Sequence, residues 1–563
     1  NQLFPIVEQL NQGRSWIKTE PERLLLAQLN LQASEKAKQA SAWEAAAIYA
    51  QIGVEQLPDT SWKSDYTLSY DLNLIHIESE FLITNTNQAK RLSETLLQHA
   101  KSSLEKAQIC LLLATQLTIT NTNYSIEKGL EGLRLCKVKI PEIEKIDDTL
   151  IEKEHQALKS LLAKKNWTNE ITTQFNTTMP IETSLIYRLC SQLTGACQIA
   201  GNQNLHVYIV YKGMSTALEQ GTNEQALVLY AMYSAMLAKQ ERYLEAEEVA
   251  STTLRLLEHY PKCADLPFIY MVLGSFVWFH THPLKQAIEL QLTAHEIGYE
   301  YGDILRGVVA GYSNSIINHY AQGLPLDQLD TRLKHLESLI LKHRFNALGG
   351  SNYRRLLDML TQPGLKNQLT ASAFTNEEWS RIQSSGVKLF IDHLQLQWHF
   401  WSDQPEAAWH SFKSAKSSPS QMSGYITSVE HNFISGLLIC KQLYAASEDT
   451  QNELKHLLDQ SLIKFKELST LCPANFEHKY LLLQAERGRG LNQSIETLAP
   501  LYEAAIESAE KNEFLQYQAL ANELYGAFWL DKKLPKTAVS HIQEALHLYQ
   551  HWGCRIKVNK LIE

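Results

Sequence analysis

The chain has 563 residues, of which 44% are hydrophobic and 20% are charged, and its formal net charge is −9. A mildly acidic chain with both signs interspersed argues against nucleic acid as a partner, because phosphate binding needs a basic stripe. No apolar run reaches the ~18 residues that a membrane-spanning helix needs, and there is no signal peptide. We therefore expect a cytoplasmic protein without membrane insertion. Because the first residue is Asn1 and not a methionine, we also expect a piece of a longer polypeptide.

The first predicted block, residues 1–164, consists of amphipathic helix pairs. The ranges with helical spacing of apolar residues are Pro21–Gln51, Leu72–Ala100 and Lys106–Cys136. Asn85 and Asn121 fall between the two helices of the second and third pairs, where asparagine tolerates turn geometry. The recurrence of this turn indicates a structural repeat. The polar stretch 164–180 is predicted to be a connecting loop.

The second predicted block, residues 181–343, continues the repeat. Pro283 suits the first turn of a helix, and the Gly323-Leu324-Pro325 sequence is a strong helix stop. The third block, residues 344–423, is predicted to be less regular, because it contains two Gly-rich turns and ends in a Ser-rich stretch at 413–423.

The last predicted block, residues 424–563, holds the clearest repeat unit, Ala519–Gln550. This unit fits the tetratricopeptide pattern of two antiparallel helices in about 34 residues. The residues that it places at packing positions are Gly526 and Trp529 in the first helix and Ala538, Ile542 and Ala545 in the second. A unit of this kind buries its apolar face only against its neighbours. The predicted fold class is therefore all-α, an α-solenoid of antiparallel helix pairs that forms a tetratricopeptide-like superhelix.

Both ends of the chain resemble a known family. The stretches that carry the resemblance are Leu10–Gly53, Cys472–Gly490, Ala519–Phe528 and Trp552–Glu563. They are similar to the helical region of large bacterial multidomain signalling ATPases of the STAND or AAA type, in which sensor modules and a histidine kinase or cyclase commonly follow. The middle of the chain, about Leu150–Ser420, matches more loosely. The sequence departs from the family at Ser34, where glycine is usual, and at Cys554, where alanine is usual. The resemblance implies an ATPase before Asn1 and an output domain after Glu563.

Motifs for catalysis are absent from the sequence. There is no P-loop and no Gly-x-Gly-x-x-Gly, His-Glu-x-x-His or His-Arg-Asp sequence, so we predict no catalytic residues and no cofactor. The eight cysteines include no Cys-x-x-Cys pair and are expected to be buried thiols in a reducing compartment. His280 and His282, with Cys263 upstream, are possible metal ligands, but their setting is more typical of a helix end. We predict no metal site.

Three residues are candidates for an interaction surface. Trp401 follows a helix that carries several aromatic residues, and tryptophan is favoured at binding hot spots. Arg354 and Arg355 lie close to Gly349-Gly350, where guanidinium groups and exposed backbone amides suit an anion. A solvated helix face is the alternative interpretation for both arginines.

The leading functional hypothesis is a non-catalytic scaffold that couples an upstream ATPase to a downstream signalling output domain. Its partners would be domains of the same polypeptide or a protein ligand. One alternative is a stand-alone adaptor or effector that binds a partner protein with the same surface. Another is an enzyme with a pocket at residues 344–369. The sequence does not fix the oligomeric state.

Overall fold

The structure is a computed structural model. The residues that it describes are 3–40, 42–83, 85–118, 121–164, 179–261, 263–343, 349–366, 368–369, 375, 378, 387–416, 424–443 and 448–563. Three predictions lie wholly or partly outside these residues: most of the loop at 164–180, the start of the 344–369 segment, and most of the Ser-rich stretch at 413–423.

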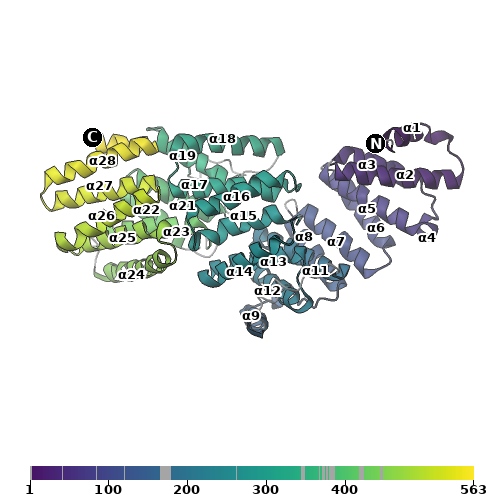
Figure 1. The fold of residues 1–563 in the computed structure, drawn as a ribbon, viewed down its shortest axis with the longest axis horizontal. Helices are drawn as coiled ribbons and strands as arrows, with labels where there is room; N and C mark the ends of the chain where they lie inside the picture. The colour runs from purple at the N-terminus through teal and green to yellow at the C-terminus, as the bar shows by residue number, and fades with distance from the viewer. Residues whose placement is uncertain are drawn as a thin grey trace. The chain divides into compact units, whose positions relative to one another are not determined.

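Helices are the only regular elements in the described part of the chain, and consecutive helices run antiparallel (Figure 1). The all-α prediction is confirmed. The chain forms two compact units, an N-terminal unit (Asn1–Leu229) and a C-terminal unit (Tyr230–Glu563). The division lies in the first turn of α13 (Leu227–Lys239), inside the block predicted at 181–343.

The N-terminal unit contains helices α1 to α12. Their bounds are α1 Leu3–Gln12, α2 Glu20–Gln39, α3 Trp43–Gln56, α4 Ser61–Ser64, α5 Tyr66–Leu82, α6 Thr86–His99, α7 Ser103–Leu117, α8 Thr122–Leu135, α9 Asp148–Lys164, α11 Ile181–Ala200 and α12 Gln203–Gln220, with short 3₁₀ turns η1 Arg14–Trp16, η2 Ile143–Lys145 and η3 Glu224–Ala226.

Side-chain caps set several helix starts in this unit. Ser102 and Glu105 form a capping box at α7, because the Glu105 amide donates to Ser102 Oγ at 3.1 Å and the Ser102 amide donates to Glu105 Oε2 at 2.8 Å. Asn85 and Asn121, predicted as turn residues, are the residues before α6 and α8, and the Asn121 side chain accepts from the Tyr124 amide at 3.3 Å. The asparagines therefore mark where the second helix of each pair begins.

The C-terminal unit contains α13 to α29. The bounds of its other helices are α14 Tyr243–Leu257, α15 Leu266–Phe276, α16 Leu284–Gly298, α17 Tyr312–Gln322, α18 Leu326–His343, α19 Tyr353–Thr361, α21 Val387–Trp401, α22 Pro405–Lys416, α23 Ile426–Gln442, α24 Glu448–Leu471, α25 Pro473–Gly490, α26 Ile495–Lys511, α27 Leu515–Asp531, α28 Pro535–Trp552 and α29 Arg555–Ile562, with η4 Trp278–His280, a π-helical segment η5 Ile304–Gly311 and η6 Gly349–Asn352.

Two stacks of paired helices make up most of this unit. In the first stack, α15 to α18, each helix packs on the next, and in the second stack, α23 to α29, it does so again. Helices α19 and α21 lie between the stacks, since α19 packs on α18 and α21 packs on α23. One continuous apolar core runs through both stacks.

The terminal pair, α27 and α28, is in close contact around Gly526 and Ala538. Ala538 and Ala545 are fully buried, and Trp529 is partly buried against the core. A Cβ atom added at Gly526 would lie 2.7 Å from Ile542 Cγ1 and 3.2 Å from the Ala538 carbonyl oxygen. The small side chain at Gly526 is therefore what allows the two helices to approach each other.

Replacing Ala538 with leucine should destabilise this pair by ~1–3 kcal/mol, because the added methylenes enter a close contact. Since helix pairs are stabilised by their neighbours, the loss should speed hydrogen exchange first in α27 to α29 and leave the N-terminal unit unchanged. Val539→Leu, at a neighbouring position that is 49% exposed, is the matched control. Unchanged protection of α27 and α28 in Ala538→Leu would contradict the packing.

Candidate functional site

Trp401 is not a surface residue. It is 1% exposed, its Nε1 donates to Gln397 Oε1 at 2.9 Å, and its ring lies 5.1 Å from that of Trp552. The prediction of an interaction residue at this position is corrected: the last turn of α21 faces the second stack, and α28 covers the indole.

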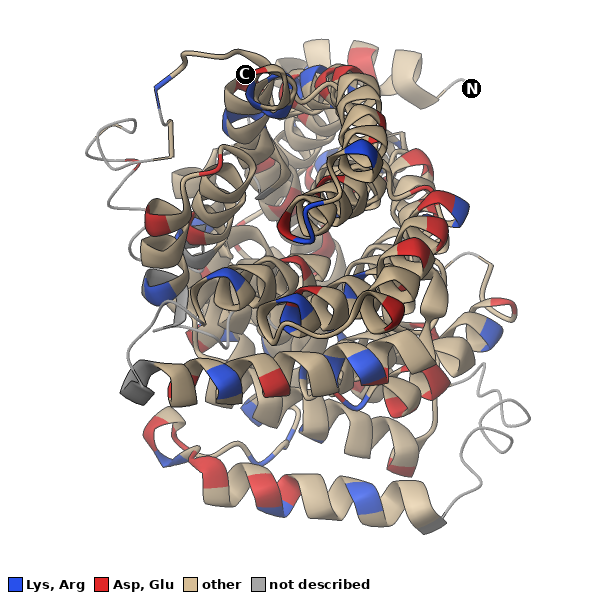
Figure 2. Cartoon of the chain, turned by 90° about the vertical axis from the view of Figure 1, so that its left-hand side faces the viewer, with Lys and Arg blue, Asp and Glu red and all other residues tan. Residues whose placement is uncertain are grey.

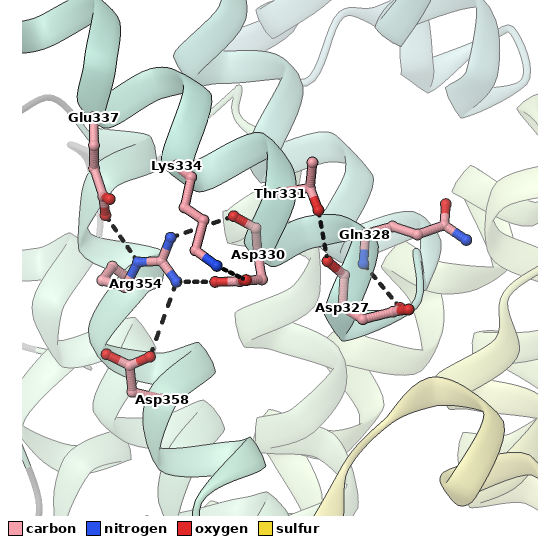
Figure 3. Close-up of polar contacts among 8 residues, drawn as sticks. All are labelled: Asp327, Gln328, Asp330, Thr331, Lys334, Glu337, Arg354 and Asp358. Atoms are coloured by element: carbon pink, nitrogen blue, oxygen red, sulfur yellow. Dashed lines mark hydrogen bonds and ion pairs between the residues drawn. The ribbon is translucent and has the colours of Figure 1, made fainter.

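Arg354 lies in a cluster of charges between α18 and α19 (Figure 3). Its Nε donates to Glu337 Oε1 at 2.8 Å, its Nη1 pairs with Asp330, and Asp358 lies 3.9 Å away. Lys334 also pairs with Asp330, at 2.7 Å. Burial would raise the pKa of Asp330, but hydrogen bonds from Lys334 and Arg354 outweigh it and lower that pKa. Through these ion pairs, Arg354 joins α18 to α19. Because the cluster holds three carboxylates and two cations, its net charge is negative, and Arg354 is poorly placed to bind an anion.

Arg355 and the Gly-Gly turn are also engaged within the chain. Arg355 Nη1 donates to the Gln368 carbonyl at 3.1 Å, and the Gly350 amide donates to Ser313 Oγ at 3.0 Å. A Cβ atom at Gly350 would lie 2.4 Å from the Ser313 carbonyl oxygen. The turn therefore packs tightly on α17, and the amide of Gly350 already has an acceptor, whereas residues 344–348 lie outside the described part.

The possible metal ligands are not gathered into a site. His280 is 3% exposed, and its Nδ1 lies 3.1 Å from the Val277 carbonyl oxygen, while the ring of His282 stacks on Trp278 at 4.1 Å. Within the described ranges, no group of three or more His, Cys, Asp or Glu side chains is placed to hold a metal ion. Both histidines instead shape the turn between α15 and α16.

A buried ion pair lies at the centre of the second stack. Lys479 of α25 is 0% exposed, and its Nζ lies 3.4 Å from Glu430 Oε1 of α23. The Tyr517 hydroxyl of α27 donates to the other oxygen of Glu430. Lys479 also lies over the rings of Phe514 and Tyr517, at 4.5 Å from each centroid. Helices α23, α25 and α27 therefore meet at one buried charge pair.

Burial shifts the pKa values of this pair towards the neutral forms. It lowers the pKa of Lys479 and raises that of Glu430, and the attraction between the two groups offsets part of each shift. His478, next along α25, is fully buried, and burial holds its pKa well below the usual range. A sequence signal for this centre existed: Lys479 follows Phe476 by three residues and precedes Leu483 by four, so it lies on the buried stripe of its helix.

A second charge cluster, centred on the buried Lys557, holds α29 in place. Lys557 Nζ lies 2.8 Å from Glu523 Oε1 and 3.1 Å from Asp403 Oδ2, and the Tyr549 hydroxyl donates to Glu523 Oε2 at 2.6 Å. Lys557, Glu523 and Asp403 border a cavity of about 10 Å³ that Phe400 and Leu520 also line. A cavity of that size has room for about one water molecule.

Charges of both signs are interspersed along the helices on the side of the molecule that Figure 2 shows. Across the described residues, none of the helices combines the length and the apolar character needed to traverse a bilayer.

The chain is similar to one part of a known signalling protein. It is 24% identical over 377 residues to the protein named Hybrid signal transduction histidine kinase G of Dictyostelium discoideum, and the match covers 62% of this chain. The chain spans only 11% of the length of that relative. No family model matches the chain. The expected relation to the helical region of STAND-type ATPases therefore stays a prediction.

Proposed function

We propose that the chain is a non-catalytic interaction and regulatory module of a signalling protein. The observation that carries this proposal is the similarity to a 377-residue part of a signal transduction histidine kinase. Because that part is 11% of the relative, most of the relative lies outside the matched region. A module of this kind would couple an upstream ATPase to a downstream output domain, by contacts within the polypeptide or with a protein ligand.

The architecture supports action through surfaces. Arrays of helix pairs present extended faces, and small shifts at each interface add up along the array. The cavity beside Lys557, with its volume of about 10 Å³, is far too small for a metabolite. A cytoplasmic location and a bacterial parent protein belong to this proposal. A stand-alone adaptor or effector and an enzyme with a pocket at residues 344–369 are the alternatives.

The test uses the full-length polypeptide that contains this chain. Ala538→Leu loosens the α27–α28 pair, so we expect it to change the output reaction while nucleotide turnover stays at the wild-type rate, and Val539→Leu should change neither. The isolated chain is expected not to hydrolyse ATP. A reading frame without an ATPase or an output domain would overturn the coupling role. An unchanged output reaction in Ala538→Leu, when hydrogen exchange shows that the α27–α28 pair has loosened, would overturn it as well.

A further inference from the structure

The two stacks of the C-terminal unit meet at their turns, through residues that are far apart in the sequence. At the first joint, Asn475, in the first turn of α25, donates from Nδ2 to the carbonyls of Phe279 at 2.6 Å and His282 at 2.8 Å. Its Oδ1 accepts from the Leu284 amide at 2.8 Å. One buried amide side chain thus satisfies three backbone groups of the turn between α15 and α16.

The second joint repeats this arrangement one helix pair further along. Gln516 of α27 donates from Nε2 to the Ala321 carbonyl at 2.8 Å, at the end of α17. Gln322 donates from Nε2 to the Asn512 carbonyl at 2.8 Å. Across both joints, the hydrogen-bonded residues are separated by 190 to 196 positions in the sequence. The turns of the first stack therefore contact the turns of the second stack in the same order along the chain.

The joints differ in chemistry from the contacts within each stack. The joints add buried hydrogen bonds to the apolar core that runs through both stacks, whereas the α27–α28 pair is held by close apolar packing. The second joint also leaves polar atoms unsatisfied, since Oε1 of Gln322 and Oε1 of Gln516 are buried without a hydrogen-bond partner. Opening would return both oxygens to water, so desolvation favours the open state at this joint. The ion pair between Lys285 and Glu513 adds little, because both side chains are more than half exposed.

The joints adjoin the buried ion pair of the second stack. Lys479 Nζ donates to the backbone carbonyl of Asn475 at 3.3 Å. At the other joint, Gln516 is the chain neighbour of Tyr517, whose hydroxyl donates to Glu430. Asn475 and Gln516 are each 2% exposed, so both joints are buried next to residues that contact the ion pair.

We propose that these two joints form one releasable seam, which seals the Glu430–Lys479 pair when closed and admits water to it when open. The helix pairs inside each stack stay packed during this opening. The seam is a property of the C-terminal unit alone and holds whichever partner the module has.

The test is native-state hydrogen exchange on the full chain, with Asn475→Ala as the variant. A seam that opens as one unit predicts at least tenfold faster exchange at the Leu284 amide and also at the side-chain amides of Gln322 and Gln516, which bond across the other joint. The α27 and α28 amides should keep their protection. Asn522→Ala is the control, since Asn522 is also buried but its hydrogen bonds, to the Gln518 carbonyl at 3.0 Å and to His541 Nδ1 at 3.1 Å, stay within the α27–α28 pair. Faster exchange confined to the mutated joint, or equal acceleration throughout the unit, would overturn the proposal.

Two further measurements keep the test decisive if Asn475→Ala does not fold. In the wild-type chain at low urea, the amides of both joints should open in one common transition, at a lower urea concentration than the amides of α27 and α28. Separate transitions for the two joints, or one global transition, would refute a common seam. Chemical acylation should modify Lys479 at least tenfold faster in Gln516→Ala than in Asn522→Ala. Equal rates in a folded variant would show that the seam does not seal the ion pair.

Discussion

Replacing Lys479 with methionine is expected to lower the free energy of unfolding of the C-terminal unit by about 3–5 kcal/mol. The substitution leaves the Glu430 carboxylate buried without its cation, and both side chains are almost completely buried in the structure, at 0% and 3% exposure. Urea-induced unfolding, followed through the exchange of amides in α23, α25 and α27, measures the loss.

Two variants control this experiment. The double variant Glu430→Leu with Lys479→Met should recover most of the stability, because a buried ion pair can often be replaced by apolar groups of similar volume without loss. Lys466→Met, on the exposed face of α24, should change stability by less than about 0.5 kcal/mol. A cost below about 1 kcal/mol for Lys479→Met would show that the pair is hydrated and not sealed.

Acidification from about pH 7 to about pH 5 is expected to destabilise the C-terminal unit strongly. Five buried histidines have lowered pKa values, in each case mainly because burial disfavours the charged ring. They are His280 with a pKa of about 3, His319 and His431 with pKa values of about 4, and His393 and His478 with pKa values well below the usual range.

The sign follows from which state binds the protons. Below about pH 6.5 these histidines are protonated in the unfolded chain but stay neutral in the folded unit. The free energy of unfolding is therefore unaffected by them above that pH and decreases as the pH falls below it. Each histidine can contribute up to about 1.4 kcal/mol per pH unit. Glu430 and Glu486, whose pKa values burial raises, act in the opposite direction and offset part of the loss.

Urea unfolding at several pH values measures this dependence. His393→Leu should flatten the curve, because His393 is fully buried and neither of its ring nitrogens has a hydrogen-bond partner. His410→Gln, at an exposed position of α22, should leave the slope unchanged. An identical slope in His393→Leu and the wild-type chain would mean that this ring is solvated in the folded state.

The local features of the fold were predictable from the sequence because they depend on neighbouring residues. The spacing of apolar residues identified the helices, and the small residues Gly526 and Ala538 identified the register of the last pair. Asn121 marked a helix start through its short polar side chain. Each of these signals involves residues of one helix or of two consecutive helices.

The predicted surface residues were less successful because their environment depends on distant segments. Trp401 is covered by Trp552, and their rings lie 5.1 Å apart although about 150 residues of chain separate them. The repeat pattern assumes that each pair contacts only its neighbours, and it says nothing about a second stack. Arg354 has a different cause, since its ion-pair partner Asp330 lies on the preceding α-helix, 24 positions earlier, and the repeat pattern does not predict which polar side chains meet there.

The nearly constant separation of 190 to 196 residues across the two joints restricts how the chain can change in length. An insertion of a few residues in a turn on the outer edge of either stack leaves the joints aligned. An insertion or deletion inside a helix between the joints shifts one stack against the other, so that Asn475 and Gln516 no longer face their carbonyls. Length variation in relatives should therefore concentrate in the outer turns, and the gain of a helix pair in one stack should be matched by a gain in the other.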